Sequence, residues 1–315
     1  MGGSKYKGFA VPLACGAFRF PRDIIESGSG EFMHCVVPGA EAVLDREYPV
    51  LDKGFVRLVD YMGGDERVVQ SARVSYGAGT RTMREDAALI DYLMRNSHTS
   101  PFEQVILTFH VKLPVFVARQ WIRHRTARLN EISGRYSVLK DDFYVPAPED
   151  VSAQNADNKQ GRSGEILDPA LTEKIRAEMI KGQKEAYASY SSFVEEGIAR
   201  ELARINLPLS LYTEWYWQID LHNLFNFLKL RLDSHAQKEI RLYAELLFEI
   251  AKKVAPECCK SFEQHVLLGV HFSGEELEEL RRKLGENDAS SGTAEALSGK
   301  ALKRFEEKIK TGRQL

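Results

Sequence analysis

The residues best suited to chemistry lie between positions 119 and 135, where five arginines occur in a chain whose net charge is only −2. A guanidinium group keeps its charge in proteins and can donate two parallel hydrogen bonds to a phosphate. Glu131 and Ser133 lie in the same stretch and could orient an arginine or contact a ligand hydroxyl. The cluster therefore predicts a site for a phosphorylated ligand. The arginines are Arg119, Arg123, Arg125, Arg128 and Arg135.

A helix followed by an extended segment is expected to position these groups. Pro114 favours a helix start, and a helix running to about position 125 would place residues 119, 120, 123 and 124 on one face. In an extended segment after it, Glu131, Ser133 and Arg135 would share one side, because strand side chains alternate. The competing interpretation is a solvated charged face. The concentration of arginine, and the two apolar residues at 121 and 122 that would anchor the helix, argue against it.

Ser133 and His124 also invite an interpretation as nucleophile and base. A serine nucleophile needs a base within hydrogen-bond reach, and the sequence identifies none. Because Ser133 stands between a glutamate and an arginine, we interpret it as a substrate contact. The charges of Arg123 and Arg125 should disfavour the cationic form of His124. We therefore expect His124 to act as a hydrogen-bonding or stacking group rather than as a general base.

A second polar set lies on and just beyond a helix predicted over residues 221–234. This helix is apolar over most of its circumference, so we expect it to be largely buried. Asn226, Arg231 and His235 would then need partners, because burying an unpaired polar group costs several kcal/mol. Arg231 could be satisfied internally by Asp233 or Glu239, or it could serve a ligand. The pattern alone leaves these two interpretations equal.

Composition limits the function. Hydrophobic residues make up 43% and charged residues 28%, as in ordinary globular proteins. A near-neutral chain lacks the wide positive field of a general nucleic-acid binder. The sequence holds no G-x-G-x-x-G after a strand, no P-loop, no H-E-x-x-H and no C-x-x-C, so neither a Rossmann unit nor a metal site is predicted. We interpret the four cysteines as free thiols, and without a membrane span or signal core we expect a cytoplasmic protein.

The predicted fold class is α+β, with helices packed on a small mixed sheet and no Rossmann unit. Strands are expected near residues 55–60, 105–111 and 215–219. Helices are expected over about 65–72 with Asp65 as its cap, and over 84–95, 114–125, 169–196, 198–206, 221–234, 237–254 and 259–269. We divide the chain into an N-terminal extension (1–48), a main domain (49–270) with a long loop at 148–168, and a C-terminal helical tail (271–315), in which a linker near 285–292 precedes a helix over 294–310.

The segment Arg123-His124-Arg125, followed by seven residues and Ser133, resembles the R-H-R-x7-S signature of the flavin-dependent thymidylate synthases. Further segments resemble the same family: FVARQ at 116–120, WIRHR at 121–125, NEISGRY at 130–136, SHTSPFE at 97–103, ARINLPL at 203–209 and LRLDSHAQ at 230–237. The resemblance covers about residues 51–262 and leaves out 1–48, 148–168 and the tail after about 265. It implies that family's fold, with 49–270 as its catalytic domain.

The resemblance implies roles for individual residues. The implied contacts of the substrate dUMP are Gln120, Trp121, Ile122, Arg123, Glu131, Ile132, Ser133, Gly134, Arg135, Arg204 and Arg231. The implied FAD contacts are Ser100, Arg123, His124, Arg125, Glu131, Asp220, Leu221, His222 and Asn226. Arg231 is similar to a catalytic residue that sits by the uracil and favours its ionised form. His98 and His235 would lie near the site, and Asp220 stands where some members carry asparagine.

The chemistry implied by the resemblance is the reductive methylation of dUMP to dTMP. NADPH would reduce the FAD, and methylene-tetrahydrofolate would supply the carbon. The cofactor would perform the difficult step, so no protein nucleophile is required, and no cysteine lies near any of the motifs. Family members are homotetramers whose flavin sites lie between subunits, which implies the same assembly here.

Three alternatives remain open. A different flavoprotein could modify a uridylate with another carbon donor, and it would share the phosphate cluster. A non-catalytic RNA- or nucleotide-binding protein could use the arginines, and it would bind no flavin and would bind polynucleotides in a strongly salt-dependent way. Lastly, each polar set could be a satisfied core network, in which case replacing Arg231 with alanine would lower stability without a specific catalytic loss.

Overall fold

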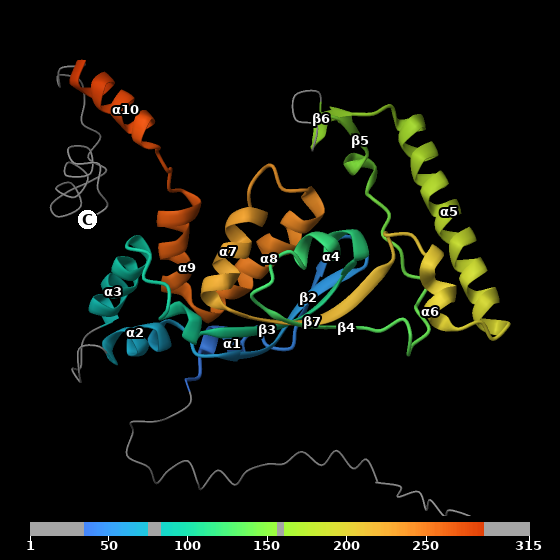
Figure 1. Ribbon diagram of the computed structural model, residues 1–315, viewed down its shortest axis with the longest axis horizontal. Coiled ribbons are helices and arrows are strands. Elements are labelled where there is room, and N and C mark those ends of the chain that lie inside the picture. The colour runs from blue at the N-terminus through green and yellow to red at the C-terminus, as the bar shows by residue number, and fades with distance from the viewer. Residues whose placement is uncertain (1–34, 75–82, 156–160, 287–315) are drawn as a thin grey trace, which may run out of the picture. The chain divides into compact units, whose positions relative to one another are not determined.

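The computed structural model describes residues 35–74, 83–155 and 161–286 (Figure 1). Its main sheet has five strands in the order β1-β2-β3-β7-β4, and each neighbouring pair is antiparallel. The strands are β1 (Glu47–Val50), β2 (Gly54–Met62), β3 (Ile106–Pro114), β4 (Arg128–Glu131) and β7 (Tyr212–Asp220). The prediction of helices on a small sheet is confirmed. The paired strands are antiparallel, however, and not mixed as we expected.

The central strand β3 separates a buried face of the sheet from a half-buried one. Leu107, Phe109, Val111 and Leu113 are fully buried, and the residues between them are only partly so. The helices α4 (Val115–Trp121), α7 (Leu221–Arg231) and α8 (Lys238–Val254) lie together on one side of the sheet in Figure 1. Alternation of this kind is expected for an antiparallel sheet that is covered on one face.

Aromatic side chains fill the space between the sheet and these helices. The ring of Trp121, the last residue of α4, is fully buried, with its centroid 5.1 Å from that of Trp217 and 4.8 Å from that of Phe227. Tyr243 of α8 lies 5.9 Å from the same ring, and its hydroxyl donates to the Lys112 carbonyl oxygen at 2.7 Å. Large aromatic groups dominate the energetics of a core. This packing fixes where α4 ends, next to the candidate site.

The helices α2 (Asp65–Arg73), α3 (Met83–Arg95) and α9 (Pro256–Phe262) pack on one another, and the 3-10 turn Phe102–Gln104 contacts α2 and α7. A π-helical turn, Glu263–Leu267, continues α9. Asp65 does not cap α2 as predicted. Its carboxylate instead accepts from the backbone nitrogens of Glu257 and Cys258, both at 2.9 Å. It therefore caps the first turn of α9, which sequence spacing could not reveal.

The described chain has a further helix on either side of the predicted main domain, α1 before it and α10 after it. The short helix α1 (Pro38–Glu41) packs on α8, where a Cβ at Gly39 would lie 2.4 Å from the Lys253 carbonyl oxygen. Residues from 38 onward are thus packed on the domain. Towards the C-terminus, the structure shows α10 (Gly274–Glu286). Most of the predicted linker near 285–292 and the whole predicted helix over 294–310 lie outside the described residues.

Between β4 and β7 the chain forms a helical excursion. It contains the 3-10 turn Pro148–Asp150, β5 (Ser152–Gln154), β6 (Arg162–Ile166), α5 (Pro169–Glu195), α6 (Arg200–Ala203) and the 3-10 turn Arg204–Asn206. The loop predicted at 148–168 is wrong in part, because β5 and β6 pair as a small antiparallel hairpin.

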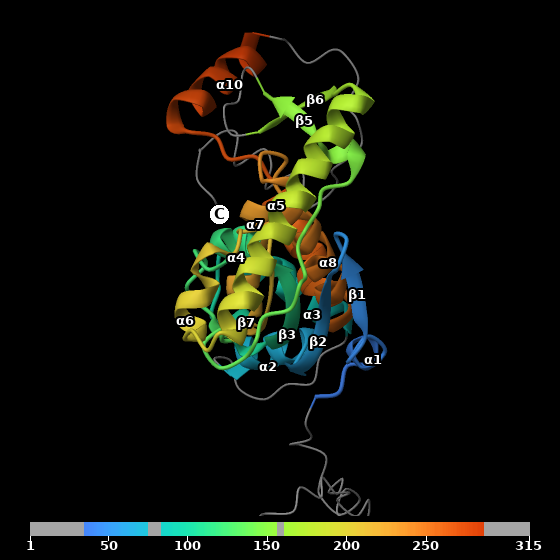
Figure 2. The same ribbon diagram turned by 90° about the vertical axis from the view of Figure 1, so that its right-hand side faces the viewer.

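The longest helix of the described chain, α5, follows this hairpin. It begins where Asp168 accepts from the backbone nitrogens of Ala170 and Leu171. Figure 2 shows α6 beside its C-terminal end. Over its 27 residues α5 buries only Thr172, Gln183 and Tyr190. None of the helices in the described segments is long and apolar enough to cross a membrane.

Candidate nucleotide and flavin site

The first arginines follow a helix that is shorter than predicted. α4 ends at Trp121, Ile122 closes it, and the backbone nitrogen of His124 donates to the Trp121 carbonyl oxygen at 3.0 Å. Arg123 and His124 therefore lie in a turn after the helix and not on a helical face with Arg119, as we had predicted. Trp121 and Ile122 have opposite environments, since Trp121 is fully buried whereas Ile122 is 37% exposed.

Arg231, the last residue of α7, joins this turn to the end of α4. Its Nε donates to Nε2 of His124 at 3.1 Å, and its Nη2 donates to the backbone oxygen of Gln120 at 3.1 Å. The residues Gln120, His124 and Arg231 form what we call the α4–α7 cluster. Neither Asp233 nor Glu239 pairs with Arg231, so the internal partners that we had named are wrong; its internal partners are His124 and Gln120. Among the described residues, Nη1 of Arg231 has no hydrogen-bond partner.

Electrostatics hold His124 neutral. Burial, together with the charge of Arg231, lowers its pKa to about 4, and the ring nitrogen that accepts from Arg231 carries no proton. The ring also lies edge-on to Phe227, with centroids 4.8 Å apart. The prediction of a hydrogen-bonding, uncharged histidine is confirmed. The responsible charge belongs to Arg231, however, and not to the neighbours in sequence that we had named.

Positive charge accumulates around the cluster. Burial and the charge of Arg123 lower the pKa of Arg231 from its usual value. Among the residues that the structure describes, neither Arg123 nor Arg231 forms an ion pair with a carboxylate. Two neighbouring guanidinium groups without a counter-ion favour an anionic ligand over an internal salt bridge.

A second set of predicted residues lies in a turn after β4. The strand ends at Glu131, whose Oε1 accepts from the Thr213 hydroxyl at 2.6 Å, and the backbone nitrogen of Ile132 donates to the Glu214 carbonyl oxygen at 2.9 Å. Residues 133–136, here called the Ser133 turn, leave the strand direction. Our expectation that Ser133 and Arg135 share one side of a strand with Glu131 is therefore wrong.

Side chains from α6 and the turn after it hold the Ser133 turn. Nε of Arg135 pairs with Glu201 at 2.9 Å, and Nη1 of Arg200 donates to the Tyr136 carbonyl oxygen at 2.7 Å. A Cβ built at Gly134 would lie 3.1 Å from Cδ and 3.2 Å from Nη1 of Arg204. Arg204 thus passes directly over Gly134, so the structure brings together two residues that are 70 positions apart in the chain.

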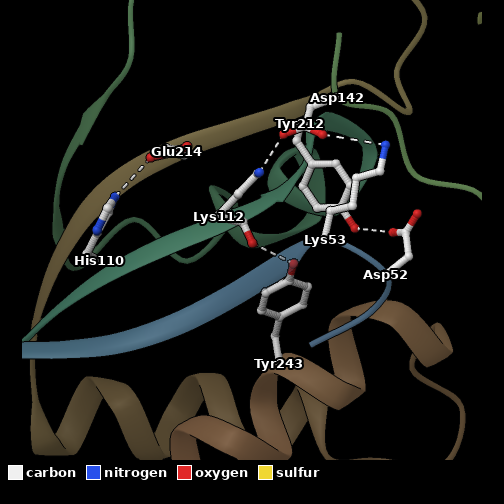
Figure 3. Close-up of polar contacts among 8 residues, drawn as sticks. All are labelled: Asp52, Lys53, His110, Lys112, Asp142, Tyr212, Glu214 and Tyr243. Carbon is white, nitrogen blue, oxygen red and sulfur yellow. Dashed lines mark hydrogen bonds and ion pairs between the residues drawn. The ribbon is translucent and has the colours of Figure 1, made fainter. Parts of the chain in front are cut away.

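A layer of polar contacts fixes the start of β7, the strand that supports Glu131 (Figure 3). Lys112 Nζ pairs with Asp142 at 2.5 Å, and Lys53 approaches the same carboxylate at 3.5 Å. The Tyr212 hydroxyl donates to Asp52 at 2.6 Å. Burial opposes ionisation of Asp142, but the hydrogen bond from Lys112 and the two lysine charges outweigh it and lower its pKa.

The third set of predicted residues surrounds a cavity of about 170 Å³, here called the His98 pocket. Its lining includes His98, His222 and Asn226, and the stacked rings of Phe225 and Phe262 lie 4.3 Å apart beside it. Asn226 Nδ2 lies 3.2 Å from Nε2 of His222. Ligand cavities usually measure about 300–1,000 Å³, so this pocket is too small to enclose a whole dinucleotide within one copy of the chain.

The remaining predicted flavin residues flank this pocket. Asp220 caps α7 by accepting from the backbone nitrogen of Asn223 at 2.9 Å, and Leu221 is fully buried beneath it. Ser100 is exposed in the turn that follows His98. Asn226 and His235 are exposed rather than buried, which corrects our expectation. His235 lies after the end of α7 and bonds to Asp233.

Some residues that serve the site had not been singled out for it. Gln237 accepts a hydrogen bond from the side-chain amide of Gln120 and donates to Glu239 at 2.8 Å. Thr213 orients Glu131, and Glu201 holds Arg135. Gln237 lies inside the LRLDSHAQ segment, which could have marked it. The spacing of residues in the sequence does not indicate a role for Thr213 or Glu201.

Comparison with known families defines the class of this protein. Residues 57–257 match the family described as thymidylate synthase complementing protein, and residues 270–315 match the thymidylate synthase ThyX C-terminal domain. Our sequence interpretation placed the 148–168 segment and the tail after about 265 outside the family. The first match corrects it for 148–168, and the second match corrects it for the tail from residue 270 onward.

Curated relatives specify the family further. A flavin-dependent thymidylate synthase of Treponema denticola is 65% identical over 272 residues, which is 86% of this chain and all of the relative. One of Treponema pallidum is 59% identical over 286 residues, which is 91% of this chain and 92% of that protein. The chain therefore belongs to the flavin-dependent thymidylate synthases.

Solved structures show the same fold. A crystal structure of the UMP/dUMP methylase PolB from Streptomyces cacaoi, bound with 5-Br dUMP, is similar with a TM-score of 0.63 and 30% identity. The match covers 71% of this chain and 100% of that one. It agrees with the α+β architecture and with the absence of a Rossmann unit from the described strands.

Proposed function

We propose that this chain methylates dUMP to dTMP with bound FAD, NADPH as reductant and methylene-tetrahydrofolate as carbon donor. The observation that carries the proposal is the α4–α7 cluster, in which Arg231 is held beside a neutral His124 and close to Arg123. Positive charge that is pre-organised without a carboxylate partner stabilises negative charge as it develops on a substrate. The flavin, when bound, supplies the reducing equivalents that convert the transferred carbon into a methyl group.

Different residues would bind the phosphate and the uracil of dUMP. Arg135 in the Ser133 turn and Arg204, which passes over Gly134, are suited to the phosphate of dUMP because both side chains can only donate hydrogen bonds. Arg231 would lie beside the uracil and favour its ionised form. Trp121 would act by packing alone, since it is fully buried, whereas the exposed Ile122 and Ile132 could touch the nucleotide directly.

The flavin would occupy the His98 pocket and reach Arg123 and Arg125. This placement fits the residues present, because the pocket offers an amide, two histidines and aromatic walls, while Arg123 and Arg125 can meet the pyrophosphate. Asp220, Leu221 and Ser100 would complete this side with backbone contacts. His98 would stand between flavin and folate, and His235 near the rim. His124 would hold Arg231 in place, and Glu131, held by Thr213, would contact the ligands directly.

The site would be completed by a second copy of the chain in a homotetramer. The surface around the Ser133 turn and α6 is rich in exposed large hydrophobic residues, which monomeric proteins rarely gather in one place. These residues are Tyr136 (76% exposed), Val138 (50%), Leu202 (58%), Ile205 (73%) and Leu209 (61%). A partner that covers them would bring its α4–α7 cluster towards the Ser133 turn. The small volume of the His98 pocket supports the same assembly.

Co-expression of two inactive variants tests the sharing of sites. Arg204→Ala and Arg231→Ala should each abolish most activity alone. If a site takes Arg231 from one copy and Arg204 from another, random mixing leaves one half times one half, or about a quarter, of the sites intact in a symmetric oligomer. Mixed oligomers with no regained activity would show that both arginines act within one copy.

Product analysis tests the reaction itself. Incubation with FAD, NADPH, methylene-tetrahydrofolate and dUMP should give dTMP, and omission of the folate should abolish it. A second candidate, methylation of UMP as well as dUMP, is favoured by the similarity to a UMP/dUMP methylase. The same assay with UMP decides between a deoxynucleotide-specific site and a broader one. Absence of any methylated nucleotide would refute both.

A further inference from the structure

A buried carboxylate behind the α4–α7 cluster has no role in the function proposed above. Glu239, in the first turn of α8, is 1% exposed. Its Oε1 accepts from Nη2 of Arg162 on β6 and from the Tyr144 hydroxyl at 3.0 Å, and its Oε2 accepts from Nε2 of Gln237 at 2.8 Å. A buried carboxylate is costly unless it is paired in this way, so the arrangement is well determined.

Glu239 is ionised and therefore only accepts hydrogen bonds. Burial alone would raise the pKa of its carboxyl group, but the hydrogen bond and the charge of Arg162 outweigh burial and lower it. Gln237 must then direct its NH2 group towards Glu239, which leaves its Oε1 facing the other way. That oxygen accepts from Nε2 of Gln120. A fixed charge thus determines the orientation of two successive side-chain amides.

These contacts determine which atom of the Gln120 side chain can face a ligand. Its backbone oxygen accepts from Arg231 and its Nε2 donates to Gln237, so its Oε1 is left as an acceptor. Arg123 and Arg231 nearby can only donate. Gln120 therefore supplies, within a strongly donating site, an acceptor that suits an N–H or hydroxyl group of the nucleotide better than its phosphate.

We propose that Glu239 and Gln237 are positioning residues that hold the Gln120 amide with its oxygen towards the nucleotide, and that Arg162 on the β5–β6 hairpin keeps Glu239 in place for this task. The proposal rests on the placement of dUMP against Gln120 argued above. It makes the hairpin, which the sequence suggested was a loop, a support for substrate recognition.

The chain offers a matched control for the hairpin. Lys238 pairs with Asp150, so a second ion pair ties the same excursion to the start of α8. The pair Lys238–Asp150 makes no side-chain hydrogen bond to Gln237, whereas the pair Arg162–Glu239 is linked to it through Glu239. Asp150→Asn weakens the attachment of the excursion without touching the chain of amides.

Steady-state kinetics of the flavin-loaded enzyme test the proposal through the split between KM for dUMP and kcat. Gln120→Leu, Gln237→Met and Glu239→Gln should each raise KM about fivefold, the effect of one ordinary hydrogen bond, and leave kcat within about twofold. Asp150→Asn should leave both unchanged. Gln237→Met should add nothing in a Gln120→Leu background. Gln237 is exposed, so its variant folds even if Glu239→Gln lowers the melting temperature.

The outcomes separate the two hypotheses. If Gln120→Leu leaves KM unchanged, the placement of dUMP against Gln120 is wrong. If Gln120→Leu raises KM but Gln237→Met does not, or if the two effects add, dUMP contacts Gln120 and the positioning role is refuted. An equal rise in KM with Asp150→Asn would mean that only the attachment of the excursion matters, which also overturns the proposal.

Discussion

Replacing Gly134 with alanine should weaken dUMP binding through Arg204. The added Cβ would lie 3.0 Å from Cδ1 of Leu139 and 3.1 Å from Cδ of Arg204. Carbon atoms prefer separations of about 3.5–4.0 Å, so the Arg204 side chain must move by about 0.5 Å. Losing roughly half of a charge-assisted hydrogen bond of about 1.5–3 kcal/mol predicts a rise of roughly three- to twelvefold in KM for dUMP. The fold should survive because only side-chain tips have to shift.

Titration of dUMP into the flavin-loaded variant, with kcat and KM from initial rates, checks this prediction. Gly182→Ala is the matched control, since a Cβ there meets no atom within 4 Å and the substitution should stabilise α5 by about 0.5–1 kcal/mol. In an Arg204→Ala background, Gly134→Ala should have no further effect on KM. Unchanged dUMP affinity in the single variant, or additive effects in the double variant, would refute the contact argument.

Three further outcomes follow from the same structure. Asp65→Ala should lower the free energy of unfolding by about 1–2 kcal/mol, as measured by denaturant titration, because α9 loses its cap. The folded pKa of His124, about 4, lies below its unfolded value of 6.5. The neutral histidine therefore contributes fully to the stability of the fold above pH 6.5, and this contribution is lost as pH falls to 4. His124→Gln should show a smaller fall in melting temperature over that pH window than the wild type. Asp142→Asn should destabilise the protein at pH 7, where Lys112 pairs with the carboxylate, and the difference should vanish as pH falls below about 3.8, since the folded pKa of Asp142 is depressed.

Local pattern predicted the elements better than it predicted their ends. The apolar run of β3 and the amphipathic repeat of α8 were sufficient because burial follows directly from such periodicity. The end of α4 depends on where Trp121 meets Trp217 and Phe227, a contact between segments about 100 residues apart. No local rule contains that information.

At the candidate site, too, the residue types could be predicted from the sequence but their tertiary contacts could not. Residue types and spacing identified Arg231 and the arginines near Ser133, and resemblance assigned their roles. The partners of Arg231 could not be predicted, since Gln120 lies on another helix, α4, and His124 lies in the turn after it. Gln237 was missed because its importance rests on a hydrogen bond that spans 117 positions. Tertiary contacts of this kind decide which polar groups are satisfied internally and which are left for a ligand.

Anaerobic reduction of the FAD-loaded protein by NADPH, followed by visible absorbance with and without dUMP, tests the central claim most directly. We expect the flavin band of the wild type to bleach, and to bleach faster with dUMP present. Arg231→Ala should retain the flavin band but lose the response to dUMP, because the cation beside the uracil is gone while the His98 pocket is intact. A protein that binds no flavin at any FAD concentration, or a variant that responds to dUMP as the wild type does, would contradict the account.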